Sequence, residues 1–303
     1  ASGKAWASQV DGRFHGCGHD GHTTTLLYAA EYLARTRQFN GTLQLIFQPA
    51  EELLYGGRVM VEDGLFDKFP CDRIFGLHNM PGQAVGKIGL RDGAMMASSD
   101  TLHIEVKGVG GHGAVPEHTV DATLVACHIT LALQSIVSRN ITPFEPAVVT
   151  VGSIQAGHAP NIINDKVLMK LTVRTLNEQV RETVLQRIHD IAVAQAESFN
   201  ATATLTHVNG SPVLKNDPAA NQMVREVATS LFGEAQVGEV KPFMGSEDFA
   251  FMLEHNPNGC YFTIGAGDEA DRCMVHNPGY DFNDEILLKG AALWCGLTEH
   301  YLR

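Results

Sequence analysis

The order of predicted elements between residues 100 and 208 constrains the fold of this chain more than any other sequence feature. Residues 101–107 (TLHIEVK) alternate between apolar and polar side chains, which predicts a strand with one buried face. Later patterns predict helices over 120–138 and 178–199 and strands over 147–154, 166–175 and 202–208. The resulting order, β-α-β-β-α-β, is that of the ferredoxin-like split βαβ fold. We therefore expect residues 100–208 to form a separate α+β domain.

The segments on either side of this domain have the pattern of an α/β fold. Short apolar runs alternate with helical patterns, the runs over 42–47 (TLQLIF) and 73–77 (RIFGL) and the helices over 23–35 and 57–63. Strand, helix and strand at this spacing predict a parallel βαβ unit. After residue 208 the sequence predicts a buried strand at 260–264 and helices over 218–232 and 284–302. We expect one α/β domain with a mostly parallel sheet, formed by residues 1–99 and 209–303 and interrupted by the inserted domain.

The charge balance and the distribution of apolar residues exclude several classes of protein. The 303 residues include 22 Lys and Arg against 34 Asp and Glu, a formal net charge of −12, without a basic cluster. This acidity argues against nucleic acid or an anionic membrane surface as a partner. No apolar run reaches the roughly 18 residues of a membrane span, since the most apolar stretch, 120–137, contains Asp121, His128 and Gln134. The six cysteines are scattered without CxxC spacing, which favours reduced thiols and a cytoplasmic protein.

A histidine-rich segment near the start of the chain is the strongest chemical signal. His15, Cys17, His19, Asp20 and His22 all occur within the eight residues HGCGHDGH. A thiolate and an imidazole two residues apart, separated by glycine, can present two ligands to one metal ion. Asp20 can orient a histidine as a hydrogen-bond acceptor, whereas His15 and His22 are each typical of a polar turn or helix cap. The cluster as a whole predicts metal binding.

A pair of carboxylates at the end of a predicted strand is the second signal. Glu51 and Glu52 follow the apolar run over 42–47 after three intervening residues. Ligand sites in open α/β sheets collect at the carboxyl ends of the strands. A metal hydrolase can use such a pair with one carboxylate as ligand and the other as general base for the attacking water.

Two further histidines complete a candidate ligand set. His78 ends the predicted strand over 73–77, and His276 lies in a loop within MVHNP. Each histidine alone is typical of a hydrogen-bonded structural residue. Together with the earlier signals they give five sulfur, nitrogen and oxygen donors, which suit two adjacent ions that share a bridging ligand: Cys17, His19, Glu52, His78 and His276.

At this point the chain resembles a known family. It is similar to the metal-dependent amidohydrolases that include hippurate hydrolase and the indole-acetyl-amino-acid hydrolases, a branch of the aminoacylase/carboxypeptidase clan. The resemblance runs from residue 15 to the C-terminus in family order, through HGCGHDGHTTTLL, LIFQPAEE, GLHNMPG, KGVGGHGAVPE, PNIIND, VRT, FMGSEDFAFML and MVHNPGYDFND. It implies a metallohydrolase domain of helices around a mostly parallel sheet, with an inserted lid or dimerisation domain.

Residue roles follow from the resemblance position by position. It implies that Cys17, His19, Glu52, His78 and His276 ligate two divalent ions, with Cys17 as the bridge. Zinc suits the thiolate, and manganese, cobalt or nickel suit the nitrogen and oxygen donors. The implied general base is Glu51, and the implied oxyanion donor is His112 of the inserted domain, acting within the chain or from a partner subunit of a homodimer. The implied substrate-binding residues are Asn161, Arg174, Gly245 and Ser246.

The expected function is hydrolysis of the amide bond of N-acyl amino acids, such as hippurate-like conjugates. Two alternatives stay open at this stage, a carboxypeptidase or dipeptidase acting on short peptides and a non-catalytic metal-binding module. Family members carry an Asp-bearing RADMDALP-type motif upstream of the Cys/His cluster, which nothing in this sequence matches. We therefore expect the chain to lack the N-terminal part of the family's catalytic domain.

Overall fold

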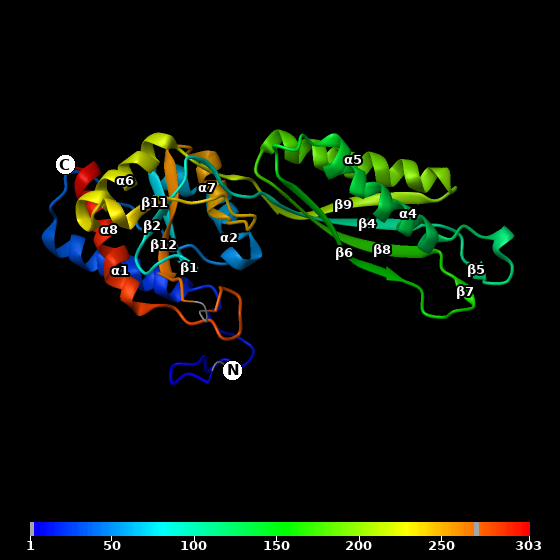
Figure 1. Ribbon diagram of the computed structural model, residues 1–303, viewed down its shortest axis with the longest axis horizontal. Coiled ribbons are helices and arrows are strands. Elements are labelled where there is room, and N and C mark those ends of the chain that lie inside the picture. Colours follow the sequence, from blue (N-terminus) through cyan, green and yellow to red (C-terminus); the bar gives the residue numbers. More distant parts are fainter. Residues whose placement is uncertain (1–2, 270–272) are drawn as a thin grey trace.

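The structure is a computed structural model that describes residues 3–269 and 273–303. It has two lobes joined end to end (Figure 1): a main lobe, in which the described part of the chain begins and ends, and an elongated inserted lobe, residues 99–211. The helices are α1 (His19–Thr36), α2 (Gly56–Glu62), α3 (Leu65–Lys68), α4 (Ala122–Ser135), α5 (Glu178–Ser198), α6 (Pro218–Phe232), α7 (Phe249–His255) and α8 (Leu287–Tyr301). Short helical turns are η1 (Glu51–Leu53), η2 (Pro116–His118), η3 (Ile136–Asn140), η4 (Glu234–Gln236) and η5 (Asp284–Ile286).

The strands are divided between the two lobes. The main lobe holds β1 (Ile74–Pro81), β2 (Ile88–Leu90), β3 (Gly93–Met96), β10 (Leu214–Asn216), β11 (Val237–Glu239) and β12 (Gly259–Gly267). The inserted lobe holds β4 (Ser99–Lys107), β5 (Gly111–His112), β6 (Ala147–Ala156), β7 (Ile162–Ile163), β8 (Lys166–Thr175) and β9 (Thr202–Ser211).

The main lobe is a three-layer α/β structure. Its four-stranded sheet has the order β1-β12-β2-β11, with two parallel pairs and one antiparallel pair between β12 and β2. Helices α1, α6 and α8 lie on one side of the sheet, and α2 and α7 lie on the other (Figure 1). Strand β12 runs through the middle and is buried along its whole length. The expected α/β class with a mostly parallel sheet is confirmed.

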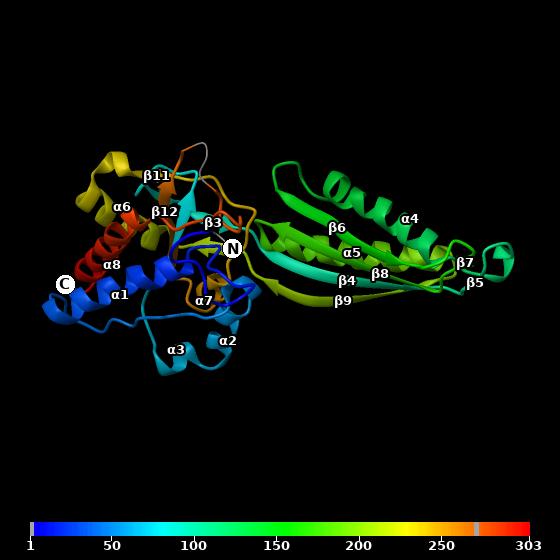
Figure 2. The same cartoon turned by 90° about the horizontal axis from the view of Figure 1, so that it is seen from below.

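The inserted lobe has the predicted ferredoxin-like order. Its antiparallel sheet runs β6-β8-β4-β9, and α4 and α5 cover one face (Figures 1 and 2). Alternate residues of the strands meet the helices in one apolar core, which includes the fully buried Ile104, Ile129, Met169 and Ile188. Asp121 caps α4 by accepting hydrogen bonds from the backbone N–H groups of Thr123 and Leu124.

One helix in the described part of the chain, Ala122–Asn140, is long and apolar enough by length and composition to cross a membrane. Its buried residues Val125, Ile129 and Leu133 recur at every fourth position and pack against the sheet of the inserted lobe. Packing in this core accounts for the apolar side of the helix.

The strand predicted over 42–47 is wrong, because these residues form no strand. Among the described residues no strand lies beside them, so no ladder of backbone hydrogen bonds forms, and β1 pairs only with β12. Leu45 and Phe47 are 40% and 45% exposed in consequence. The segment still leads directly into η1, where the two predicted carboxylates lie.

A buried ion pair anchors the entry to the inserted lobe. Asp100 on β4 is fully buried and accepts hydrogen bonds from Arg181 Nε at 2.9 Å and Nη2 at 2.8 Å. His207 Nε2 lies 2.8 Å from the same carboxylate.

Replacing Arg181 by Ala is expected to lower the free energy of unfolding by about 3 kcal/mol, because the buried Asp100 carboxylate would lose both hydrogen bonds from the guanidinium and keep only the His207 ring beside it. Denaturant unfolding measures this loss. The control is Arg187→Ala on the same helix, whose ion pair with Asp190 is exposed and should contribute less than about 1 kcal/mol. Equal losses in the two variants would contradict this account of Asp100.

Candidate metal centre

Five predicted ligands from four separate segments converge in the main lobe. Cys17 lies just before α1 and His19 is the first residue of that helix, whereas Glu52 is on η1, His78 on β1 and His276 in the loop after β12. Their ligand atoms form groups in which all atoms lie within 4.8 Å of one another, and two of these groups share Cys17: Cys17, His19 and His78; Cys17, Glu52 and His276. The arrangement offers a thiol flanked by two sets of nitrogen and oxygen donors.

Individual distances show how closely these side chains approach. Cys17 Sγ lies 3.3 Å from His78 Nε2, and His276 Nε2 lies 3.3 Å from Glu52 Oε2. His19 Nε2 faces both carboxylates of η1, at 3.7 Å from Glu51 Oε2 and 3.9 Å from Glu52 Oε1.

The residues fit a divalent cation. His19 Nε2 is buried and has no hydrogen-bond partner among the residues that the structure describes. A buried nitrogen without a partner carries a desolvation penalty that a cation at this position would remove. The thiol, imidazole and carboxylate donors are also the ligand types that zinc takes in proteins.

Burial sets the protonation of these donors. Desolvation lowers the pKa of His78 to about 4 and lowers that of His19, so both imidazoles are neutral and able to ligate near pH 7. Burial raises the pKa of the Cys17 thiol well above its usual range, and the charges of Glu52 and Glu51 add to this shift. A cation beside the sulfur would favour the thiolate.

A hydrogen-bonded network behind β1 orients His78. His78 Nδ1 donates to the Asn79 carbonyl oxygen at 2.6 Å, which leaves the Nε2 lone pair facing Cys17. The Asn79 side chain is fully buried between His22, at 2.6 Å, and the Tyr280 hydroxyl, also at 2.6 Å. Sequence reasoning missed Asn79 and Tyr280, although the position of Asn79 directly after His78 was a usable signal.

The turn that carries Glu51 is held in an unusual backbone conformation. Ala50 and Leu54, the residues on either side of η1, adopt left-handed φ values of 56° and 50°. Such conformations cost energy in non-glycine residues and persist only where the surrounding structure enforces them. Gly56 permits the turn, because a Cβ there would lie 1.5 Å from the Pro49 carbonyl oxygen.

Glu51 is the most strongly perturbed carboxylate of the site. Burial raises its pKa to about 9, and the charges of Glu247, Asp248 and Glu52 act in the same direction. A perturbed carboxyl of this kind beside a candidate metal centre is typical of a proton-transferring group. Gly245, which is exposed, and Ser246, which is half-buried, immediately precede Glu247 in the sequence.

Two other predicted residues do not lie at the metal centre of their own chain. His112 is on β5 and Asn161 is just before β7, both at the end of the inserted lobe that is farthest from the main lobe (Figure 1). They are neighbours there, since the Gly113 N–H donates to the Asn161 carbonyl oxygen at 2.8 Å. Arg174 lies at the opposite end of the lobe, half-buried, where its guanidinium donates to the Ser99 hydroxyl.

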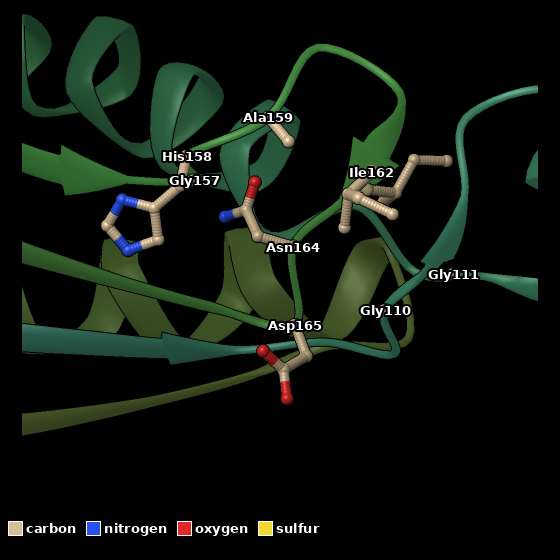
Figure 3. A pocket seen from close by; sticks show the side chains of 9 residues that line it. Gly110, Gly111, Gly157, His158, Ala159, Ile162, Asn164 and Asp165 are labelled. Carbon is tan, nitrogen blue, oxygen red and sulfur yellow. The ribbon is translucent and has the colours of Figure 1, made fainter.

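An open cavity of about 520 Å³ adjoins His112 and Asn161 at the tip. Figure 3 shows His158, Asn164 and Asp165 around it, with Gly110 just before β5 and Gly111 as its first residue. The cavity is therefore part of the distal end of the inserted lobe and not of the metal centre in the main lobe.

Comparisons with known proteins agree with this geometry. Hippurate hydrolase from Campylobacter jejuni is 43% identical to this chain over 299 residues, which are 98% of this chain and 77% of that protein. N-acetyl-L-cysteine deacetylase from Bacillus subtilis is 37% identical over 291 residues, covering 96% of this chain and 68% of that protein. A solved Bacillus subtilis structure, described as a dinuclear metal-binding peptidase from the M20 family, superposes with a TM-score of 0.84. It is 31% identical, and the match covers 100% of this chain and 77% of that one.

The model of one protein family spans almost the entire sequence. Peptidase family M20/M25/M40 matches residues 2–300, which include all elements of both lobes except the last residue of α8. The chain therefore belongs to peptidase family M20/M25/M40.

Proposed function

We propose that this chain uses two divalent metal ions to hydrolyse the amide bond between an acyl group and an amino acid. The observation that carries the proposal is the pair of donor groups that share Cys17, with the buried carboxyl of Glu51 beside them. The names of the two relatives described above, hippurate hydrolase and N-acetyl-L-cysteine deacetylase, support N-acyl amino acids as the substrate class.

The proposed ligands of the two ions are Cys17, His19, Glu52, His78 and His276, with the sulfur of Cys17 shared. We favour zinc because of the thiolate, and manganese, cobalt or nickel are the alternatives that suit the other donors. When bound, the ions would polarise the acyl carbonyl and lower the pKa of water.

Glu51 acts as the general base in this proposal. Its carboxylate takes a proton from the attacking water and later returns that proton to the leaving amine. Burial raises the pKa of Glu51 to about 9, and the positive charge of the two ions would lower it toward neutrality, where a carboxylate can both take up and return a proton.

His112 stabilises the negative oxygen that develops on the acyl carbon. The Ala114 N–H donates to His112 Nδ1 at 3.1 Å, so the ring proton of the neutral imidazole is on Nε2, free to donate to an oxyanion. Because His112 lies at the distal end of its own inserted lobe, we propose that His112 of the partner subunit serves each metal centre in a homodimer formed through the inserted lobes.

The remaining predicted residues would bind the substrate. Arg174 and Asn161 are proposed to hold the carboxylate of the amino acid, since guanidinium and amide groups donate to carboxylate oxygens. Gly245 and Ser246 are proposed to line the pocket, where they border the carboxylates around Glu51.

A substrate panel tests the proposed class. We expect turnover of benzoyl-glycine and acetyl-amino acids to exceed that of dipeptides with a free amino terminus, measured as kcat/KM with the same zinc-loaded preparation. A preference for dipeptides would overturn the proposal and assign the chain to the peptidases of its family.

A further inference from the structure

Glu51 stands between two different groups of side chains. On one side its carboxylate belongs to a group with His19 and Glu52, and on the other to a group with Glu247 and Asp248. The ligand atoms within each group lie within 4.8 Å of one another. The group with His19 and Glu52 belongs to the metal centre. Glu247 and Asp248 form a second, buried group, at 7% and 0% exposure.

The carboxylates of Glu247 and Asp248 both accept hydrogen bonds. Glu247 accepts from the Tyr261 hydroxyl at 2.5 Å and from the Phe249 N–H at 3.2 Å. Asp248 accepts from the Gly57 N–H at 2.8 Å and from the Gln48 side chain at 2.5 Å. The hydrogen bonds to Gly57 and Gln48 tie the segment around η1 to the start of α7.

Glu51 has no such donor. Within residues 3–269 and 273–303, no hydrogen bond to its side chain is present, and its nearest ionic neighbour is His19 at 3.7 Å. Its carboxylate therefore keeps all of its acceptor sites, whereas Glu247 and Asp248 each already accept two hydrogen bonds.

Tyr261 is held rigidly on β12. Asn216 accepts from the Tyr261 N–H and donates to its carbonyl oxygen, both at 2.8 Å. The absence of a side chain at Gly76 makes room for the ring, because a Cβ there would lie 2.6 Å from it. The phenol is thus fixed in the position from which it bonds Glu247.

We propose that Glu247, anchored by Tyr261, is a positioning residue that keeps the Glu51 carboxylate directed toward the metal centre. When both groups are ionised, the Glu247 carboxylate repels the charge of Glu51 and so favours the arrangement in which Glu51 Oε2 faces His19 Nε2, 3.7 Å away. This inference rests on the proposed role of Glu51 as general base. Nothing in it requires Glu247 to contact the substrate.

The substitution Glu247→Gln tests the inference with little change in volume. The new amide would donate to Glu51 and draw its carboxylate inward. We expect kcat for benzoyl-glycine to fall by about 10- to 100-fold, which is the loss expected when a general base is displaced from the reacting atoms. KM should stay within about twofold of wild type. Tyr261→Phe, which frees Glu247 to move, should show the same split between kcat and KM with a smaller loss. Zinc content should stay at the wild-type value in both variants.

The control for Tyr261→Phe is Thr263→Val. It also removes a buried hydroxyl from β12, but this hydroxyl bonds Gln83 and not Glu247. It should leave kcat unchanged. In a Glu51→Gln background, Glu247→Gln should add no further loss, because its effect passes through Glu51. An additive loss, a wild-type kcat, or a loss of bound zinc that accounts for the lost turnover would each overturn the inference.

A measurement independent of turnover separates this inference from the proposed function. Crystal structures of the zinc-loaded wild type and Glu247→Gln should show the Glu51 carboxylate turned from His19 toward residue 247 in the variant. If the wild type hydrolyses no N-acyl amino acid, the proposed function fails, and these structures still decide the positioning role. An unmoved Glu51 would overturn the inference even in an active enzyme.

Discussion

Glu51→Gln is expected to lower kcat for benzoyl-glycine by about a thousandfold, within the range known for general acid–base groups. The amide keeps the size of the carboxylate but cannot take a proton from water. Because Glu51 is not among the proposed ligands, zinc content should remain at two ions per chain. Steady-state kinetics and metal analysis of the same preparation measure both quantities.

Two control variants separate the base from the ligands. Glu52→Gln removes a proposed ligand next to the base, so it should lose bound metal as well as turnover. Glu62→Gln changes an exposed carboxylate on α2 and should have no effect on either quantity. Residual kcat above about a tenth of wild type in Glu51→Gln would remove Glu51 from the mechanism.

Mixing two inactive variants should restore activity if His112 serves the metal centre of the partner subunit. His112→Ala alone is expected to lower kcat by about 100- to 1000-fold, the usual loss for one oxyanion donor. In a dimer of one His112→Ala chain and one Glu51→Gln chain, one of the two centres has both intact residues. Random exchange of subunits should therefore recover about a quarter of the wild-type activity.

A mixture of the two variants that stays inactive would contradict action of His112 on the partner subunit. If His112 acts on its own chain, each subunit of the mixed dimer lacks one group and no activity returns. The matched control is His118→Ala, another exposed histidine of the same distal region, which should keep wild-type turnover. Sedimentation of the mixture shows whether exchange has occurred, so an absence of recovery in exchanged dimers contradicts action across the interface.

The fold of the inserted lobe could be predicted from sequence because its pattern is local. Each strand alternates on its own, and each helix has one apolar stripe, so the order β-α-β-β-α-β follows without knowledge of distant contacts. The segment 42–47 shows the limit of this reasoning. Its apolar run predicts a strand, but a strand also needs a neighbour, and none lies beside it among the described residues.

The candidate site also has one part that the sequence predicts and another part that it does not. The proposed ligands stand in unusual local contexts, such as HGCGHDGH, and the structure brings them together from four segments. Glu247 and Asp248 lie within the stretch FMGSEDFAFML, but the sequence predicts no role for them or for Tyr261, because their importance arises from burial beside Glu51. An acidic pair and a tyrosine of a buried strand become a supporting group only when β12, α7 and η1 pack together.

The most direct test of the central claim is hydrolysis of benzoyl-glycine by the purified chain before chelation, after chelation and after readdition of zinc or manganese. We expect turnover that disappears when both ions are removed and returns when they are restored. Turnover that persists in a metal-free preparation would contradict the account, as would its absence across N-acyl amino acids in a chain with two bound ions.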